Sequence, residues 1–148
     1  MSAVRSKDTA YEIEIRKSLF ANGFRYRLHG KNLPGKPDMV FPKYNAVILV
    51  NGCFWHNHDC RFAKLPETRR AWWKQKLYGN RIRDKRVMKE LKKLGWRTLI
   101  IWECSFRKPR AIRGAALDKI TKKAIKFLLS RKRHLEISEI NRRKKLAQ

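Results

Sequence analysis

Residues 46 to 60 read AVILVNGCFWHNHDC, an apolar run followed directly by a segment rich in metal-binding side chains. The run Ala46 to Val50 contains no polar residue, which predicts a central strand buried on both faces of a sheet. The segment Asn51 to Cys60 holds two of the three cysteines and two of the four histidines of the chain. Sulfur and imidazole donors gathered in one short segment predict a metal-binding loop at the end of this strand.

The side chains predicted to hold a metal ion are Cys53, His58, Cys60 and Cys104, the last of which follows another apolar run. Three cysteines and one histidine make a closed tetrahedral zinc site of the structural type. Disulfides are disfavoured because the number of cysteines, three, is odd and the N-terminus does not read as a secretory signal. His56 competes with His58 for the same ligand position. The alternative to zinc is a buried free thiol at Cys104 beside an incidental cluster.

The elements on either side of this stretch predict an α/β fold. The first is a helix that begins at a capping box formed by Thr9 and Glu12 and ends at Gly23. It is followed in chain order by strands over 24–28, 38–41 and 46–50, helices over 66–79 and 80–95, a strand over 96–102, and a helix around 120–128. A chain of 148 residues predicts a single domain, with a core over about residues 5–130. Residues 131–148 are polar and basic and predict a partly disordered tail.

The charge of the chain points to nucleic acid. It carries 38 Lys and Arg against 12 Asp and Glu, a net charge of +26 at pH 7, which suits a protein that neutralises phosphates. A ribosomal-type or membrane-surface protein is the alternative, and charge alone does not choose among them. The longest apolar runs are strand-sized, so no membrane span is expected. We therefore expect a cytoplasmic, nucleoid-associated protein that is monomeric by default.

Asp38 is the candidate ligand for a hard cation. It follows Pro37 at the start of a predicted strand, after the rigid turn at Leu33 to Lys36. Carboxylate oxygens are the donors that Mg²⁺ prefers, and acidic side chains are scarce in this chain. The alternative is an aspartate that only stabilises the turn.

Together these residues resemble the very-short-patch repair (Vsr) endonuclease family. The resemblance covers roughly residues 5 to 107 and rests on LPGKPD (33–38), GCFWH (52–56) with His58 and Cys60, RD (83–84), GWR (95–97) and WEC (102–104). It implies a PD-(D/E)xK restriction-endonuclease-like fold, with a central mixed sheet flanked by helices and a structural zinc site. It also implies a strand-specific DNA endonuclease that nicks 5′ to the thymine of a T:G mismatch left by deamination of 5-methylcytosine. The catalytic metal of the family is magnesium.

The resemblance also implies the roles of the site residues. Asp38 and the backbone carbonyl of Val50 bind magnesium, and His56 is the general base that activates water. Glu12 is an accessory acid, and Asp84 orients His56. Each of the last two has a structural alternative, because Glu12 closes a capping box and Asp84 lies among basic residues where a helix-surface ion pair is the default.

Aromatic residues next to the predicted metal loop are implied to enter the DNA stack beside the mismatch: Phe54, Trp55 and Trp73. The alternative is that they are core residues, and this is the reading we prefer for Trp72, Trp96 and Trp102.

Two departures leave room for another function: Asn51 stands where some members of the family have histidine, and some relatives carry a longer N-terminal arm that helps to grip DNA. They make a catalytically inactive zinc-stabilised DNA-binding protein one competing prediction. The other is a related Vsr-like nuclease of restriction or mobile-element type, which keeps this core and cuts a different site. Intact Asp38 and His56 argue against the inactive protein. Mismatch-repair proteins are possible partners, and the flanking bases recognised cannot be read from the sequence.

Overall fold

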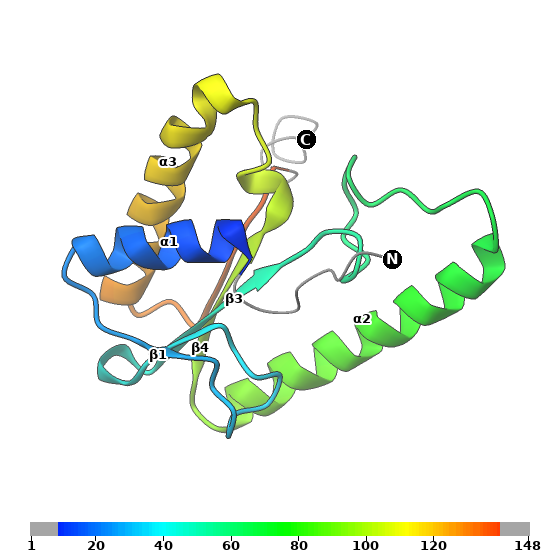
Figure 1. The fold of residues 1–148 in the computed structure, drawn as a ribbon. Coiled ribbons are helices and arrows are strands. Elements are labelled where there is room, and N and C mark those ends of the chain that lie inside the picture. The colour runs from blue at the N-terminus through cyan, green and yellow to red at the C-terminus, as the bar shows by residue number, and fades with distance from the viewer. Residues whose placement is uncertain (1–8, 140–148) are drawn as a thin grey trace, which may run out of the picture.

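A computed structural model describes residues 9–139 and shows a five-stranded sheet between two layers of helices (Figure 1). The elements are α1 (Ala10–Ala21), β1 (Arg27–Leu28), β2 (Met39–Phe41), η1 (Pro42–Tyr44), β3 (Ala46–Asn51), α2 (Arg70–Lys93), β4 (Arg97–Trp102), η2 (Glu103–Ser105), α3 (Arg110–Leu129) and β5 (His134–Ile137). Among the described residues, no helix is long and apolar enough to cross a membrane.

The sheet is mixed and has β3 at its centre. The strand order is β1-β2-β3-β4-β5. The β1–β2 and β2–β3 pairs are antiparallel, and the β3–β4 and β4–β5 pairs are parallel. Five of the six residues of β3 are buried, as expected of a strand covered on both faces. The prediction of a central buried strand and a mixed sheet flanked by helices is confirmed.

Alternate residues of the central strands build the two cores. Ile48 of β3 packs in the core that α1 and α3 cover, with Leu19 and Phe127 fully or almost fully buried there. Val47 and Leu49, which point to the opposite face, pack in the core that Leu91 of α2 covers. The predicted start of α1 is confirmed with Thr9 as its N-cap, because the Thr9 hydroxyl accepts a hydrogen bond from the Glu12 backbone N–H at 3.2 Å.

Helix α2 runs without interruption where the sequence predicts two helices. It begins at Arg70, after Arg69 in the left-handed conformation, and continues through Gly79 to Lys93. A glycine inside a helix costs only about 1 kcal/mol relative to alanine, and Leu77 and Leu91 bury their side chains on either side of it. The break predicted at Gly79 is therefore wrong.

The segment assigned to the basic tail contains the edge strand β5. Residues 134–137 pair in parallel with β4, and Ile137 joins the main core. The strand was missed because His134-Leu135-Glu136-Ile137 is short and lies in a strongly basic context. Residues 140–148, the rest of the predicted tail, lie outside the described residues.

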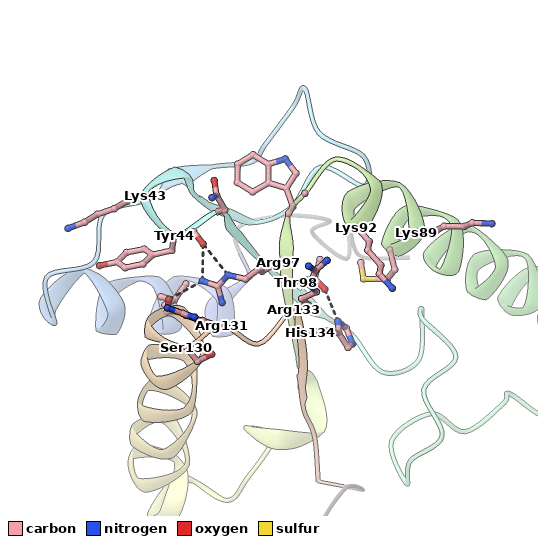
Figure 2. Close-up of a pocket in the computed structure, with 15 residues that line it drawn as sticks. Lys43, Tyr44, Lys89, Lys92, Arg97, Thr98, Ser130, Arg131, Arg133 and His134 are labelled. Atoms are coloured by element: carbon pink, nitrogen blue, oxygen red, sulfur yellow. Dashed lines mark hydrogen bonds between the residues drawn. The ribbon is translucent and has the colours of Figure 1, made fainter.

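The Arg97 side chain links β4 to the C-terminal end of α3 by hydrogen bonds. Its guanidinium donates hydrogen bonds to the carbonyls of Tyr44, Phe127, Leu128 and Lys132 at 2.8 to 3.2 Å, and Figure 2 shows the bonds to Tyr44. Two of these carbonyls, those of Phe127 and Leu128, belong to the last turn of α3, where carbonyls have no partner within the helix; Ser130 also donates to the Phe127 carbonyl. The same end of the sheet holds a cavity of about 930 Å³ whose lining includes Lys43, Lys89, Lys92, Arg131 and Arg133 (Figure 2).

We predict that Arg97→Lys lowers the free energy of unfolding by about 2 kcal/mol, because an ammonium cannot serve four carbonyls in the plane that the guanidinium spans. Urea denaturation followed by circular dichroism measures this change. Arg131→Lys, at an exposed position of the same cavity, is the matched control. A loss below about 0.5 kcal/mol at Arg97 would show that water replaces the guanidinium.

Candidate active site and metal centre

The C-terminal ends of β3 and β4 bring the predicted metal ligands together. These neighbouring strands are parallel, so the chain leaves both at the same edge of the sheet. The loop after β3 carries Cys53, His58 and Cys60, and η2 after β4 carries Cys104. Ligand atoms of these four residues all lie within 4.8 Å of one another. The four side chains that the sequence predicts as metal ligands therefore form one group that could hold a metal ion.

Two buried cysteines form the inner part of this cluster. The backbone N–H of Cys104 donates to Cys53 Sγ at 3.3 Å, and His58 Nδ1 lies 3.7 Å from Cys104 Sγ. A hydrogen bond from the Cys53 thiol and the neighbouring His58 lower the pKa of Cys104 to about 4. Burial of Cys104 acts in the opposite direction and only partly offsets this decrease. The pKa of Cys53 is raised, because its proton is shared with Cys104 and because it is buried. A thiolate is thus already favoured at Cys104, and thiolates are the form of cysteine that binds metals.

The surroundings of the cluster fix the orientation of its ligands. The His58 ring stacks on Trp102 with a centroid distance of 3.9 Å and an interplanar angle of 7°. The Trp102 indole N–H donates to Glu136 at 2.8 Å. The backbone N–H of Glu139 donates to Cys104 Sγ at 3.4 Å, and the Glu139 carboxylate accepts two hydrogen bonds from Arg61 of the loop. Sequence reasoning missed these supports because they come from β5 and the residues after it.

Asp38 lies immediately before β2, beside the C-terminal part of β3. Its Oδ2 accepts a hydrogen bond of 2.6 Å from the backbone N–H of Val50. Burial raises the pKa of Asp38 to about 7, with the Val50 N–H lowering it and Glu12 raising it. His29 and His56 lower the pKa further, so both imidazoles are near enough to act on this carboxylate. A buried carboxylate with a raised pKa is typical of a functional site.

The preceding turn is held in place by a close approach to α2. Gly35 has a φ of +71°, and a Cβ added there would run into the side chain of Val87. Only glycine combines this left-handed conformation with this contact at low cost. The LPGKPD motif therefore positions Asp38 by packing its turn against the helix that also carries Asp84.

His56 and Asp84 form a direct pair across the loop and α2. His56 Nδ1 lies 2.7 Å from Asp84 Oδ2, and each side chain is about one-third exposed, at 31% and 34%. The helix also anchors the loop, because Asn80 donates a side-chain hydrogen bond to the Trp55 carbonyl at 3.0 Å. His56 and His58, which the spacing alone does not separate, thus lie in different settings: His58 among the cysteines and His56 against a carboxylate.

Glu12 belongs to a second group of potential ligands. Its carboxylate, the His29 ring and the Asp38 carboxylate lie within 4.8 Å of one another, and Glu12 is only 2% exposed. The Glu12 backbone N–H donates to the cap at Thr9, while its carboxylate lies in the Asp38 group, so the structure favours the accessory position over the capping-box position for this side chain. His29 is not among the site residues that the sequence predicts. Its place beside Asp38 depends on the register of the hairpin, which the sequence does not reveal.

The aromatic residues form a half-exposed cluster beside His56. Ring centroids of Phe54, Trp55 and Trp73 lie 5.1 to 6.0 Å apart, and all three side chains are partly exposed. Trp72 packs edge-on against Trp73 and is 42% exposed, so its assignment to the core is wrong. Trp102 is buried, and Trp96 packs partly buried against the α2 core.

The raised pKa of Asp38 predicts a pH-dependent cost to stability. The folded protein holds a proton on Asp38 up to about pH 7, whereas the unfolded chain releases it near pH 3.8. Stability from this group is therefore present at low pH and is lost as the pH rises to 7. Asp38→Asn, whose amide oxygen still accepts the hydrogen bond from the Val50 N–H, should stabilise the protein in the absence of added divalent cations by about 2 kcal/mol at pH 8 and by much less at pH 4.5. Thermal melts at the two pH values measure this, and a pH-independent difference would contradict it.

Comparison with known proteins gives consistent matches. The sequence pattern of the family described as DNA mismatch endonuclease Vsr matches residues 1–62. The chain is 41% identical over 117 residues to the DNA mismatch endonuclease Vsr of Escherichia coli, covering 79% of this chain and 75% of the relative. It is 47% identical over 104 residues to the Type II nicking enzyme V.XorIIP of Xanthomonas oryzae, covering 70% and 76%. The Type II nicking enzyme V.NmeAIP of Neisseria meningitidis is 38% identical over 122 residues, covering 82% and 86%.

The matches to these relatives extend over more than two-thirds of the chain, at identities of 38% to 47%. This protein therefore belongs to the Vsr family of DNA mismatch endonucleases.

Proposed function

We propose that this protein is a magnesium-dependent DNA endonuclease that nicks one strand 5′ to the thymine of a T:G mismatch, in a single nuclease domain of the PD-(D/E)xK type. The observation that carries the proposal is the His56–Asp84 pair of 2.7 Å near the partly buried Asp38 carboxylate. An imidazole held by a carboxylate near a ligand for a hard cation is what phosphodiester hydrolysis requires. The relatives, named as mismatch endonuclease and nicking enzymes, support the same reaction.

Asp38 and the backbone carbonyl of Val50 are the proposed magnesium ligands. In an extended strand the N–H and C=O of one residue point to the same side, and the Val50 N–H points at Asp38. The Val50 carbonyl then faces the Asp38 carboxylate as well, which fits two oxygen donors to one hard cation. When bound, magnesium supplies charge that stabilises the developing negative charge on the phosphate.

His56 is the proposed general base. Asp84 would accept a hydrogen bond from Nδ1–H, which favours the tautomer whose Nε2 has a lone pair to take a proton from water. The water oxygen bonds to the phosphorus as the bond from phosphorus to the 3′ oxygen breaks, and the 3′ oxygen takes a proton from a solvent water molecule and leaves as a hydroxyl. The products are a 5′-phosphate and a 3′-hydroxyl. Glu12, buried beside Asp38, is the accessory acid of the same centre.

Cys53, His58, Cys60 and Cys104 are proposed to hold a structural zinc ion. Three sulfurs and one imidazole fill a tetrahedral shell, which leaves no position open for substrate. The ion would join the loop after β3 to η2 after β4, and so set the position of His56 three residues beyond Cys53.

Phe54, Trp55 and Trp73 are proposed to wedge into the duplex at the mismatch. They form one partly exposed aromatic cluster next to His56, and α2 continues from that cluster with many basic side chains that suit phosphates. Unstacking a step costs a few kcal/mol and costs least at a mispaired step, so insertion would favour mismatched DNA.

The test uses duplexes labelled on each strand that carry T:G, T:A or C:G at one position in several flanking contexts, incubated with protein and Mg²⁺. The proposal expects a nick confined to the thymine strand of T:G. Since several relatives are named Type II nicking enzymes, cutting of fully paired duplex at a fixed site is the second candidate function. Binding without cleavage in every context would exclude both nucleases.

A further inference from the structure

His29 lies directly opposite Asp38 in the hairpin of β1 and β2. The register pairs Leu28 with Met39, and β1 ends there. The His29 N–H donates to the Asp38 carbonyl at 3.0 Å, and the Gly30 N–H donates to the Pro37 carbonyl at 2.9 Å. His29 has a φ of +51°, so the backbone leaves the regular ladder at this residue. These hydrogen bonds keep His29 beside Asp38, and ligand atoms of the two side chains lie within 4.8 Å of one another.

Helix α1 completes the group by adding Glu12 from the other side. The donor atoms of Glu12, His29 and Asp38 lie within 4.8 Å of one another, and Glu12 is 98% buried. Two carboxylates this close together repel each other away from water, and a cation among them offsets that repulsion. The three side chains come from α1, the end of β1 and the start of β2, so the fold assembles them from separate elements.

We propose that His29 is a direct nitrogen ligand of the catalytic cation, which makes this a mixed nitrogen and oxygen site that takes a first-row transition dication such as Mn²⁺ more tightly than Mg²⁺. The inference rests on the proposed function, because it concerns the ion that Asp38 holds. Magnesium prefers oxygen donors, whereas an imidazole nitrogen adds affinity for Mn²⁺ and later metals of the row. The Asp38 and Val50 oxygens alone suit both Mg²⁺ and Mn²⁺, so the imidazole nitrogen is the donor that would shift the site toward Mn²⁺.

The position of His29 allows a clean substitution. Its φ is +51°, a left-handed conformation that asparagine adopts more readily than most residues. His29→Asn therefore keeps the backbone and removes the imidazole. The matched control is His56→Asn, which removes the other imidazole near Asp38 and leaves the Glu12, His29 and Asp38 group intact.

The decisive measurement is pulsed electron paramagnetic resonance of Mn²⁺ bound to the zinc-loaded protein without DNA. A coordinated imidazole modulates the electron spin echo through its nitrogen nucleus, and an ion pair between His29 and the carboxylates does not. Wild type and His56→Asn are expected to show this modulation, and His29→Asn is expected to lose it. Failure of the wild type to bind Mn²⁺, bound Mn²⁺ without nitrogen modulation, or modulation that persists in His29→Asn would overturn the proposal.

Affinities give a second readout that separates the ligand from a structural role. Calorimetric titration of His29→Asn should show Mn²⁺ affinity about tenfold weaker and Mg²⁺ affinity changed by less than about twofold. Equal weakening of both ions would mean that the substitution only disturbs the site, and would overturn the ligand assignment. If nitrogen modulation is present and DNA is never cut, the proposed function fails and the ligand assignment stands. If nicking requires Asp38 and the modulation is absent, the ligand assignment fails and the proposed function stands.

Discussion

His58→Ala is expected to release zinc and unfold the protein at room temperature. The substitution removes one of four side chains whose ligand atoms lie within 4.8 Å, and leaves Cys53 and Cys104 buried without a full shell. Binding of structural zinc contributes on the order of 10 kcal/mol to folding in small zinc domains, which equals or exceeds the stability of a typical domain. The loop after β3 and η2 would then lose the link that joins them.

Zinc content measured by mass spectrometry and thermal melts followed by circular dichroism test this expectation together. His56→Ala is the matched control, since it removes an imidazole two residues away that pairs with Asp84 outside the cysteine cluster. The control should retain one zinc and the wild-type melting temperature within a few degrees. If His58→Ala keeps its zinc while His56→Ala loses it, the two histidines have been assigned wrongly.

The same His56→Ala protein is expected to lose turnover, by about a hundredfold to ten-thousandfold in single-turnover nicking of a T:G duplex. The reason is that the proposed base is gone while the zinc ligands and Asp38 remain. Asp84→Asn should cost less, on the order of tenfold to a hundredfold, because the amide keeps a contact with Nδ1 but does not fix the same tautomer.

Rapid-quench assays at saturating protein isolate the chemical step from DNA binding. Wild-type rates in His56→Ala would show that another group accepts the proton from water. A larger loss in Asp84→Asn than in His56→Ala would show that Asp84 acts on the reaction by a route other than this imidazole.

Features encoded within short segments of sequence are predicted well. The apolar run of β3 and the turn that precedes Asp38 can be recognised without knowledge of distant partners, and so can the cap at Thr9. Cys53, His58 and Cys60 are predictable for the same reason, since they lie within eight residues of one another. Cys104 is distant in sequence and joins them because β3 and β4 are parallel and end at the same edge of the sheet.

Features that depend on distant partners are predicted poorly. α2 continues through Gly79 because burial of Leu77 and Leu91 outweighs the local cost of glycine. β5 forms by pairing in parallel with β4, which lies far from it in the sequence. His29 reaches Asp38 only through the register of a two-residue strand. Local patterns carry no information about such pairings, so His29 and Glu139 were missed.

The partly buried position of Asp38 also lowers the stability of the fold at neutral pH. Burial next to Glu12 raises its pKa to about 7, so the metal-free protein loses stability when this carboxylate ionises. A bound cation would remove that cost, which is the usual relation between an active site and the stability of the protein around it.

The most direct test is the nicking of a T:G duplex by zinc-loaded Asp38→Ala in the presence of Mg²⁺, after its zinc content and melting curve have been matched to wild type. Loss of cleavage to below about one-thousandth of the wild-type rate is predicted, because the carboxylate that would hold the cation is absent. Cleavage of the thymine strand at the wild-type rate by this variant would contradict the proposed active centre.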